Sequence, residues 1–235
     1  MTTIFTAWQG VRARVAAAAT RAGRPADTVE LLAVSKTFPA DAVRELYQHG
    51  QRHFGENYAQ EMHDKALQLG GDCPDLVWHF IGPLQSNKTR QVAETASWVH
   101  SVDRVKIAER LSQQRPDHLP PLQVCIQVNV SGETSKSGAT TAAAAELARQ
   151  TASLPRLTLR GLMCIPDPAA DAATLRHQFR QLAELRQELN SQGFGLDTLS
   201  MGMSADMELA IAEGATLVRV GTAIFGARSA KENTQ

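Results

Sequence analysis

Short apolar segments alternate with longer amphipathic segments along almost the whole chain, and this alternation limits the folds it can adopt. The short segments are rich in β-branched and aromatic residues and predict strands at 31–35, 52–55, 77–82, 98–102, 122–130, 157–165, 196–200 and 216–221. Several of them are apolar with little alternation, which is typical of parallel strands covered on both faces. Eight strands, each followed by a helix or loop, predict an α/β fold, the (β/α)8 TIM barrel. An open doubly wound sheet is the alternative, but it usually has fewer strands and a GxGxxG turn after the first.

The amphipathic segments predict the helices of this barrel. Apolar residues recur at helical spacing through an alanine-rich opening stretch, at Ile4, Trp8, Val11 and Val15. They predict an extra N-terminal helix that ends near Gly23, and similar patterns predict helices at 39–49 and 172–192. No linker or internal repeat divides the 235 residues, so we expect one domain at 1–235 with a loose polar tail at 229–235.

Charge and cysteine content exclude several classes of protein. Lysine plus arginine (24) equals aspartate plus glutamate (24), so no net field attracts nucleic acid or an anionic membrane. No apolar run is long enough to span a bilayer. Cys125 and Cys164 lie in apolar segments, where cysteine usually acts as a small buried hydrophobe, and no disulfide framework is apparent. We therefore expect a cytoplasmic protein. The histidines lack HExxH or clustered Cys/His spacing, so we expect no metal site.

Lys36 follows the first predicted strand directly. Barrel enzymes place their sites at the carboxyl ends of strands, so its ε-amine is expected at the rim where ligands bind. A lysine there can form a Schiff base with an aldehyde if its surroundings lower its pKa. The alternative is an ordinary solvated lysine at a strand end.

Glycine turns follow the last two predicted strands. Ser200, Met201 and Ser204 surround the first turn, and Gly221 and Thr222 form the second. Hydroxyls and backbone N–H groups at a glycine turn before a helix favour a phosphate, and barrels often bind phosphate after strands seven and eight. The alternative for Ser204 is a helix N-cap, which is compatible with phosphate binding.

Three further polar residues stand on strands or directly after them. Arg219 shares a strand face with Gly221, and its guanidinium needs an acceptor in a barrel interior. We expect it to donate to the pyridine nitrogen of pyridoxal phosphate (PLP); the alternative is an ion pair with a strand carboxylate at 197 or 30. Asn57 follows the second strand and either binds a ligand hydroxyl or phenolate or caps a helix. His79 lies within an apolar strand, which favours a hydrogen-bonded core histidine over a catalytic one.

Seven segments together resemble the PLP homeostasis protein family, single-domain barrels related to the N-terminal domain of alanine racemase. They read AVSKT, HFGENY, WHFIGPLQSNK, NVSGETSKSG, RGLMCIP, SMGMSADME and VRVGTAIFGAR. The resemblance runs through nearly the whole chain. It implies a Schiff base on Lys36 and Arg219 against the ring nitrogen, with the phosphate held around Ser200, Met201, Ser204, Gly221 and Thr222. Phe38 stands where related chains often carry lysine, which puts in doubt any transfer of PLP through a second lysine there.

Two main functions follow from this resemblance. We expect a PLP carrier or regulator, a monomer without robust catalysis, which hands PLP to PLP-dependent apoenzymes. The alternative is a racemase-like enzyme acting on amino acids. Such enzymes take a second acid/base from a tyrosine of another domain, and both tyrosines here, Tyr47 and Tyr58, lie in the first quarter of the chain. A phosphosugar-type barrel enzyme without PLP is a third hypothesis, and Lys136 is a candidate for a secondary PLP site.

Overall fold

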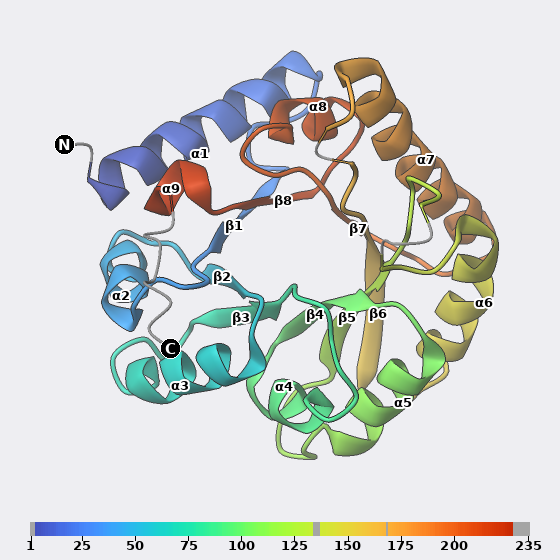
Figure 1. Ribbon diagram of the computed structural model, residues 1–235, viewed down its shortest axis with the longest axis horizontal. Coiled ribbons are helices and arrows are strands. Elements are labelled where there is room, and N and C mark those ends of the chain that lie inside the picture. Colours follow the sequence, from blue (N-terminus) through green and yellow to red (C-terminus); the bar gives the residue numbers. More distant parts are fainter. Residues whose placement is uncertain (1–2, 134–136, 168, 228–235) are drawn as a thin grey trace, which may run out of the picture.

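The computed structural model describes residues 3–133, 137–167 and 169–227, so Lys136 and the tail at 229–235 lie outside the described residues. Eight parallel strands pair in chain order, and the last pairs with the first to close the barrel (Figure 1). The strands are β1 (Glu30–Val34), β2 (His53–Glu56), β3 (Val77–Phe80), β4 (Trp98–Val102), β5 (Leu122–Gln127), β6 (Leu157–Met163), β7 (Thr198–Ser200) and β8 (Leu217–Val220). The predicted TIM barrel is confirmed.

Helices form a ring outside the strands (Figure 1). They are α1 (Ile4–Arg21), α2 (Ala40–Gln48), α3 (Ala59–Leu69), α4 (Thr89–Thr95), α5 (Val105–Gln114), α6 (Thr141–Ala152), α7 (Ala172–Ser191), α8 (Met207–Ala212) and α9 (Thr222–Phe225). None of them, within the described ranges, combines the length and the apolar character that crossing a membrane requires.

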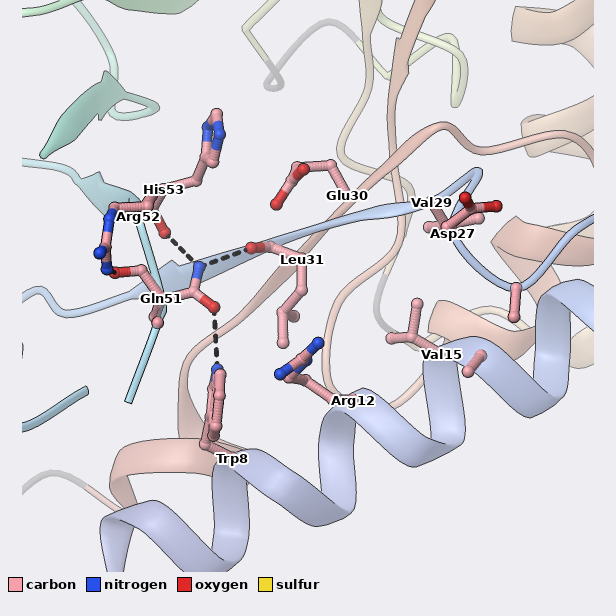
Figure 2. A pocket seen from close by; sticks show the side chains of 13 residues that line it. Trp8, Arg12, Val15, Asp27, Val29, Glu30, Leu31, Gln51, Arg52 and His53 are labelled. Carbon is pink, nitrogen blue, oxygen red and sulfur yellow. Dashed lines mark hydrogen bonds between the residues drawn. The ribbon is translucent and has the colours of Figure 1, made fainter. Parts of the chain in front are cut away.

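The N-terminal helix α1 lies beside α8 and α9, where the last and first repeats of the barrel meet (Figure 1). Trp8, Val11 and Val15 are buried on one face of it, as their spacing predicts. The Trp8 indole N–H donates to Gln51 Oε1 at 2.8 Å, and Gln51 Nε2 donates to the carbonyl of Leu31 at 2.8 Å (Figure 2). The Gln51 amide therefore connects α1 to the first strand.

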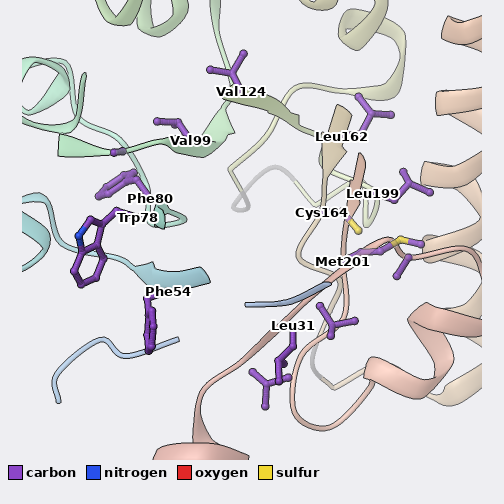
Figure 3. Packing of buried hydrophobic residues seen from close by; sticks show 14 of the residues in the cluster. Leu31, Phe54, Trp78, Phe80, Val99, Val124, Leu162, Cys164, Leu199 and Met201 are labelled. Atoms are coloured by element: carbon purple, nitrogen blue, oxygen red, sulfur yellow. The ribbon is translucent and has the colours of Figure 1, made fainter. Parts of the chain in front are cut away.

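The main hydrophobic core lies between the strands and the helices (Figure 3). One side chain from each of several strands points outward into it: Leu31, Phe54, Trp78, Val99, Val124, Leu162 and Leu199. A separate small apolar cluster, formed by Leu32, Val34, Ile81 and Leu217, fills part of the barrel interior. Burying outward side chains contributes about 1.5–3 kcal/mol for each large residue, so this shell supplies most of the driving force for closure. The interior is free to carry polar groups.

Candidate cofactor-binding site

A pocket of about 310 Å³ opens at the carboxyl ends of β1, β2, β3, β6, β7 and β8. Its volume lies at the lower end of the range typical of small-ligand sites. The residues that line it are Val34, Lys36, Phe38, Asn57, Ile81, Ile165, Met203, Ser204, Ala205, Arg219, Gly221, Thr222 and Gly226. Six of the eight predicted cofactor residues are thus brought to one pocket from four distant parts of the chain, because the carboxyl ends of parallel strands meet at one rim.

The backbone on both sides of Lys36 is held in place. Ser35 N–H donates to the carbonyl of Gly55 at 3.0 Å, and Thr37 N–H donates to Glu61 Oε1 at 2.6 Å. Thr37 has a φ of 68°, a left-handed conformation that costs a β-branched residue energy and that these bonds sustain. The Lys36 side chain is half-buried and lines the pocket. This loop positions the amine at the pocket wall.

A buried ionic cluster supports the same loop, and sequence reasoning missed it. Lys65 Nζ donates to the Ser35 carbonyl at 2.8 Å, to Glu56 Oε1 at 2.6 Å and to Glu61 Oε1 at 2.8 Å. Burial raises the pKa of Glu56 to about 7, against the opposing effects of Lys65 and the Ser35 hydroxyl. The sequence signal for this cluster is a glutamate at the end of an apolar strand, followed nine residues later by a lysine on the next helix. Neither residue reaches the pocket, so the cluster acts on Lys36 through the backbone.

The glycine turns after β7 and β8 form the opposite wall. Gly221 passes so close to Val34 that an added Cβ would lie 3.1 Å from its carbonyl oxygen. The first amide groups of a helix have no intrahelical acceptor, and the Thr222 N–H, first in α9, finds none among the described residues. Ser204 Oγ accepts from Ala223 N–H at 3.4 Å. Ser204 is not a helix N-cap, since α8 begins after Asp206.

Ser200 and Met201, also predicted to bind phosphate, are not part of the pocket lining. Met201 is fully buried, and its N–H donates to the carbonyl of Leu217 at 3.1 Å. The Ser200 hydroxyl is fully buried beneath the pocket, 2.8 Å from Arg219 Nη1 and 2.7 Å from His100 Nδ1. The sequence placed both residues at the correct strand end but did not reveal which way they face.

Arg219 is 4% exposed and is held by neutral acceptors. Nη1 donates to Ser200 Oγ at 2.8 Å, and Nη2 donates to the carbonyl of Cys164 at 2.9 Å. The predicted alternative, an ion pair with a strand carboxylate, is wrong: Asp197 pairs with Arg160 at 2.5 Å, and no carboxylate of the described ranges lies within ion-pair distance of Arg219. Burial lowers the pKa of Arg219, but an arginine remains charged. A cation with no carboxylate in direct contact therefore lines the pocket, and the buried Asp206 carboxylate acts on it from beyond ion-pair distance.

Asn57 carries an unsatisfied acceptor in the pocket wall. Its Oδ1 is buried and has no hydrogen-bond partner, and it does not cap α3, whose N-cap is Tyr58. The Asn57 backbone runs against Gly82, where an added Cβ would lie 2.1 Å from the Asn57 carbonyl oxygen. Glycine at 82 is thus required for this close approach. A buried acceptor without a partner costs free energy until a ligand donor satisfies it.

These groups match the parts of PLP one by one. Lys36 would supply an amine for the aldehyde, and Arg219 would supply a donor for the ring nitrogen. Asn57 would offer an amide to the ring hydroxyl, and Ser204 and the Thr222 N–H would be available to a phosphate. The residues present therefore fit this cofactor.

A larger pocket of about 560 Å³ lies at the other end of the barrel, between α1 and the amino-terminal ends of β1 and β2 (Figure 2). Its central amide, Gln51, is fully engaged by Trp8, Leu31 and the carbonyl of His53. Barrel sites form at the carboxyl ends of strands, so size alone does not make this pocket the functional one.

Several known proteins are similar to this chain. Residues 9–229 match the family described as "Alanine racemase, N-terminal domain". The chain is 59% identical over 228 residues to the "Pyridoxal phosphate homeostasis protein" of Pseudomonas aeruginosa, covering 97% of each. It is 55% identical over 221 residues to the protein of that name from Escherichia coli strain K12, covering 93% of this chain and 94% of the relative.

Solved structures are similar as well. PipY of Synechococcus elongatus PCC7942, with PLP bound, is 42% identical with a TM-score of 0.79, covering 90% of this chain and 98% of PipY. Alanine racemase from Corynebacterium glutamicum is 14% identical with a TM-score of 0.69, covering 94% of this chain and 62% of the racemase, and this is a likeness of fold alone.

Proposed function

Because the chain belongs to the pyridoxal phosphate homeostasis proteins, a family built on the alanine racemase N-terminal domain, we propose that it binds PLP at the carboxyl-terminal mouth of its barrel and acts in PLP homeostasis. Its role is to hold the cofactor and hand it on to PLP-dependent apoenzymes. The observation that carries this proposal is the convergence of Lys36, Asn57, Arg219 and the Gly221–Thr222 turn on one pocket.

Covalent attachment occurs at Lys36. The ε-amine adds to the PLP aldehyde and loses one water, which leaves a C=N bond, the Schiff base. The reaction runs backward when water returns, so a protein that holds PLP in this way can also release it. Arg219 and the β8 turn, which line the same pocket as Lys36, would hold the ring nitrogen and the phosphate and so would orient the aldehyde toward the amine.

The placement of the two tyrosines favours a carrier over a racemase. Racemisation needs an acid/base on each face of the substrate α-carbon, and neither tyrosine of the chain lines the pocket: Tyr47 bonds to Asp75 on the outside, and Tyr58 is 56% exposed. Arg219 can only donate, so the ring nitrogen opposite it would stay unprotonated and the bound ring would be a poor electron sink. Racemisation tolerates such an arginine, so this contact disfavours other carbanion reactions and does not separate a carrier from a racemase.

Borohydride reduction followed by peptide mapping tests the site. Protein incubated with PLP and reduced is expected to carry one pyridoxyl group on the Lys36 peptide, and Lys36→Ala is expected to lose it. Label on the Lys136 peptide alone would mean that PLP attaches at Lys136 and not at Lys36. A protein that takes up no label at all supports the phosphosugar-type hypothesis instead.

A panel of L- and D-amino acids tests the carrier role. The purified protein is expected to leave the amino acids unchanged, whereas turnover at ordinary enzymatic rates refutes the carrier role. When PLP-loaded protein is mixed with a PLP-dependent apoenzyme, the activity of the apoenzyme is expected to return faster than PLP dissociates from the loaded protein into buffer.

The proposal also covers the location of the protein in the cell and its oligomeric state. All three cysteines are free and buried, which supports a reducing, cytoplasmic location. A single closed barrel with its core on the outside of the sheet supports a monomer, which sedimentation at micromolar concentration tests directly.

A further inference from the structure

A continuous chain of hydrogen bonds crosses the barrel interior beneath the pocket. It runs from Arg219 through the Ser200 hydroxyl to His100 Nδ1, with steps of 2.8 and 2.7 Å. His100 Nε2 then lies 2.9 Å from His79 Nδ1, and His79 Nε2 lies 2.9 Å from His53 Nδ1. We call Ser200, His100, His79 and His53 the histidine relay. Its members come from β7, β4, β3 and β2, and it ends beside the pocket at the amino-terminal side of the barrel, where Figure 2 labels His53.

The relay has only one fully satisfied direction. Arg219 is a donor, so the Ser200 oxygen accepts from it, and the Ser200 hydrogen must find an acceptor of its own. The single acceptor available to it within the described residues is His100 Nδ1. With Nδ1 occupied as an acceptor, a neutral His100 carries its hydrogen on Nε2 and donates to His79, which in turn donates to His53. The reverse direction leaves the Ser200 hydrogen buried without a partner.

The buried rings are neutral. Burial lowers the pKa of His79 well below its usual value and, together with the nearby Arg219 charge, lowers the pKa of His100 to about 3. Each imidazole thus presents a lone pair on the side facing Arg219 and an N–H on the far side. A row of neutral dipoles with this orientation stabilises a buried cation without supplying a counter-charge.

We propose that the histidine relay positions Arg219 for the cofactor: Ser200 and His100 hold the guanidinium and orient its remaining donors toward the ring nitrogen of PLP. Ser200 and His100 are positioning residues, since neither lines the pocket. The contact with PLP rests on the function proposed above, but the direction of the relay is a property of the free protein. The two parts are therefore tested separately.

The direction of the relay is tested without any cofactor. Nitrogen-15 NMR of histidine-labelled free protein distinguishes the two tautomers of each ring. We expect His79 and His100 to be neutral near pH 7 and to carry hydrogen on Nε2. Hydrogen on Nδ1 of either ring, or a protonated ring, overturns the proposed direction.

The positioning role is tested with two probes that differ only at the ring nitrogen: PLP and its 1-deaza analogue, which has C–H in place of nitrogen. Ser200→Ala removes an acceptor from Arg219, so PLP affinity is expected to fall about tenfold, while affinity for the analogue changes less than about twofold. His100→Asn retains an acceptor near the position of Nδ1 and is expected to stay closer to wild type than His100→Leu. His177→Leu, on the exposed side of α7, is the matched control.

The outcomes separate the two proposals. Equal losses for both probes in Ser200→Ala mean that the relay serves general folding and refute the positioning role. If wild-type protein binds neither probe, the proposed function fails, while the NMR result still decides the direction of the relay. Thermal unfolding of each variant, followed by circular dichroism, identifies any that do not fold, and His100→Asn then carries the comparison.

Discussion

The buried carboxylate of Glu56 gives a quantitative test of the cluster beneath Lys36. Burial raises its pKa from 4.5 to about 7, so the folded protein holds this proton more tightly than the unfolded chain does. The corresponding stability is complete below about pH 4.5 and is lost as the pH rises through about 7. At about 1.4 kcal/mol per pH unit, the loss amounts to about 3 kcal/mol.

Glu56→Gln removes the titrating group and keeps an oxygen for Ser35 and Lys65. The unfolding free energy of the wild type minus that of the variant is expected to fall by about 3 kcal/mol between about pH 4.5 and about pH 8. Urea unfolding followed by tryptophan fluorescence at several pH values measures this difference, and Glu188→Gln, an exposed change on α7, is the control. The Lys65 ammonium, 2.6 Å from Glu56 Oε1, lowers the pKa of Glu56 and so opposes the effect of burial. A difference that stays constant or rises with pH means that Lys65 outweighs burial, and the reasoning is then refuted.

Three further predictions concern the pocket wall and the relay. Gly82→Ala places a Cβ 2.1 Å from the Asn57 carbonyl oxygen, so we expect it to lower the unfolding free energy by about 1–3 kcal/mol or more and to weaken PLP binding. Gly71→Ala, with open space around it, is the control and is expected to stay within about 0.5 kcal/mol of wild type. Urea unfolding and PLP titration measure both variants. Asn57→Ala removes a buried acceptor that has no partner, so we expect weaker PLP binding with unchanged or greater stability; a clear loss of stability contradicts this account. As the pH falls through 6.5, His79 and His100 become protonated in the unfolded chain but stay neutral in the folded protein, where burial lowers their pKa. The unfolding free energy is therefore expected to fall with the pH, and His100→Asn is expected to make this pH dependence weaker.

The sequence is most informative about positions at the ends of strands. Lys36, Asn57 and the Gly221–Thr222 turn could be assigned to one rim because strand order and direction alone determine which ends meet. The sequence is less informative about Ser200, which ends a strand of three residues, too short for alternation to reveal its facing.

The interior of the barrel could not be predicted from single segments. His53 pairs in register with Val77, yet its ring reaches His79, because tilted strands offset the side chains that meet across the interior. Such contacts depend on the shear of the closed barrel, which only the complete sheet determines. The Glu56–Lys65 pair joins a strand to the following helix and depends in the same way on how that helix packs.

Both ends of the pocket depend on buried polar groups that never touch the ligand, and they differ in charge. Beneath Lys36, Lys65 is balanced by two carboxylates, so the loop is held by paired charges, and burial raises the pKa of one of them, Glu56. Beneath Arg219, the hydrogen-bond acceptors are neutral, and the buried Asp206 carboxylate acts on the guanidinium only from beyond ion-pair distance. A carboxylate in direct contact would offset more of this charge and reduce the cost of protonating a ring nitrogen nearby. Neutral support therefore favours a ring that accepts a hydrogen bond and stays unprotonated, which suits a protein that stores PLP better than one that uses it to stabilise carbanions.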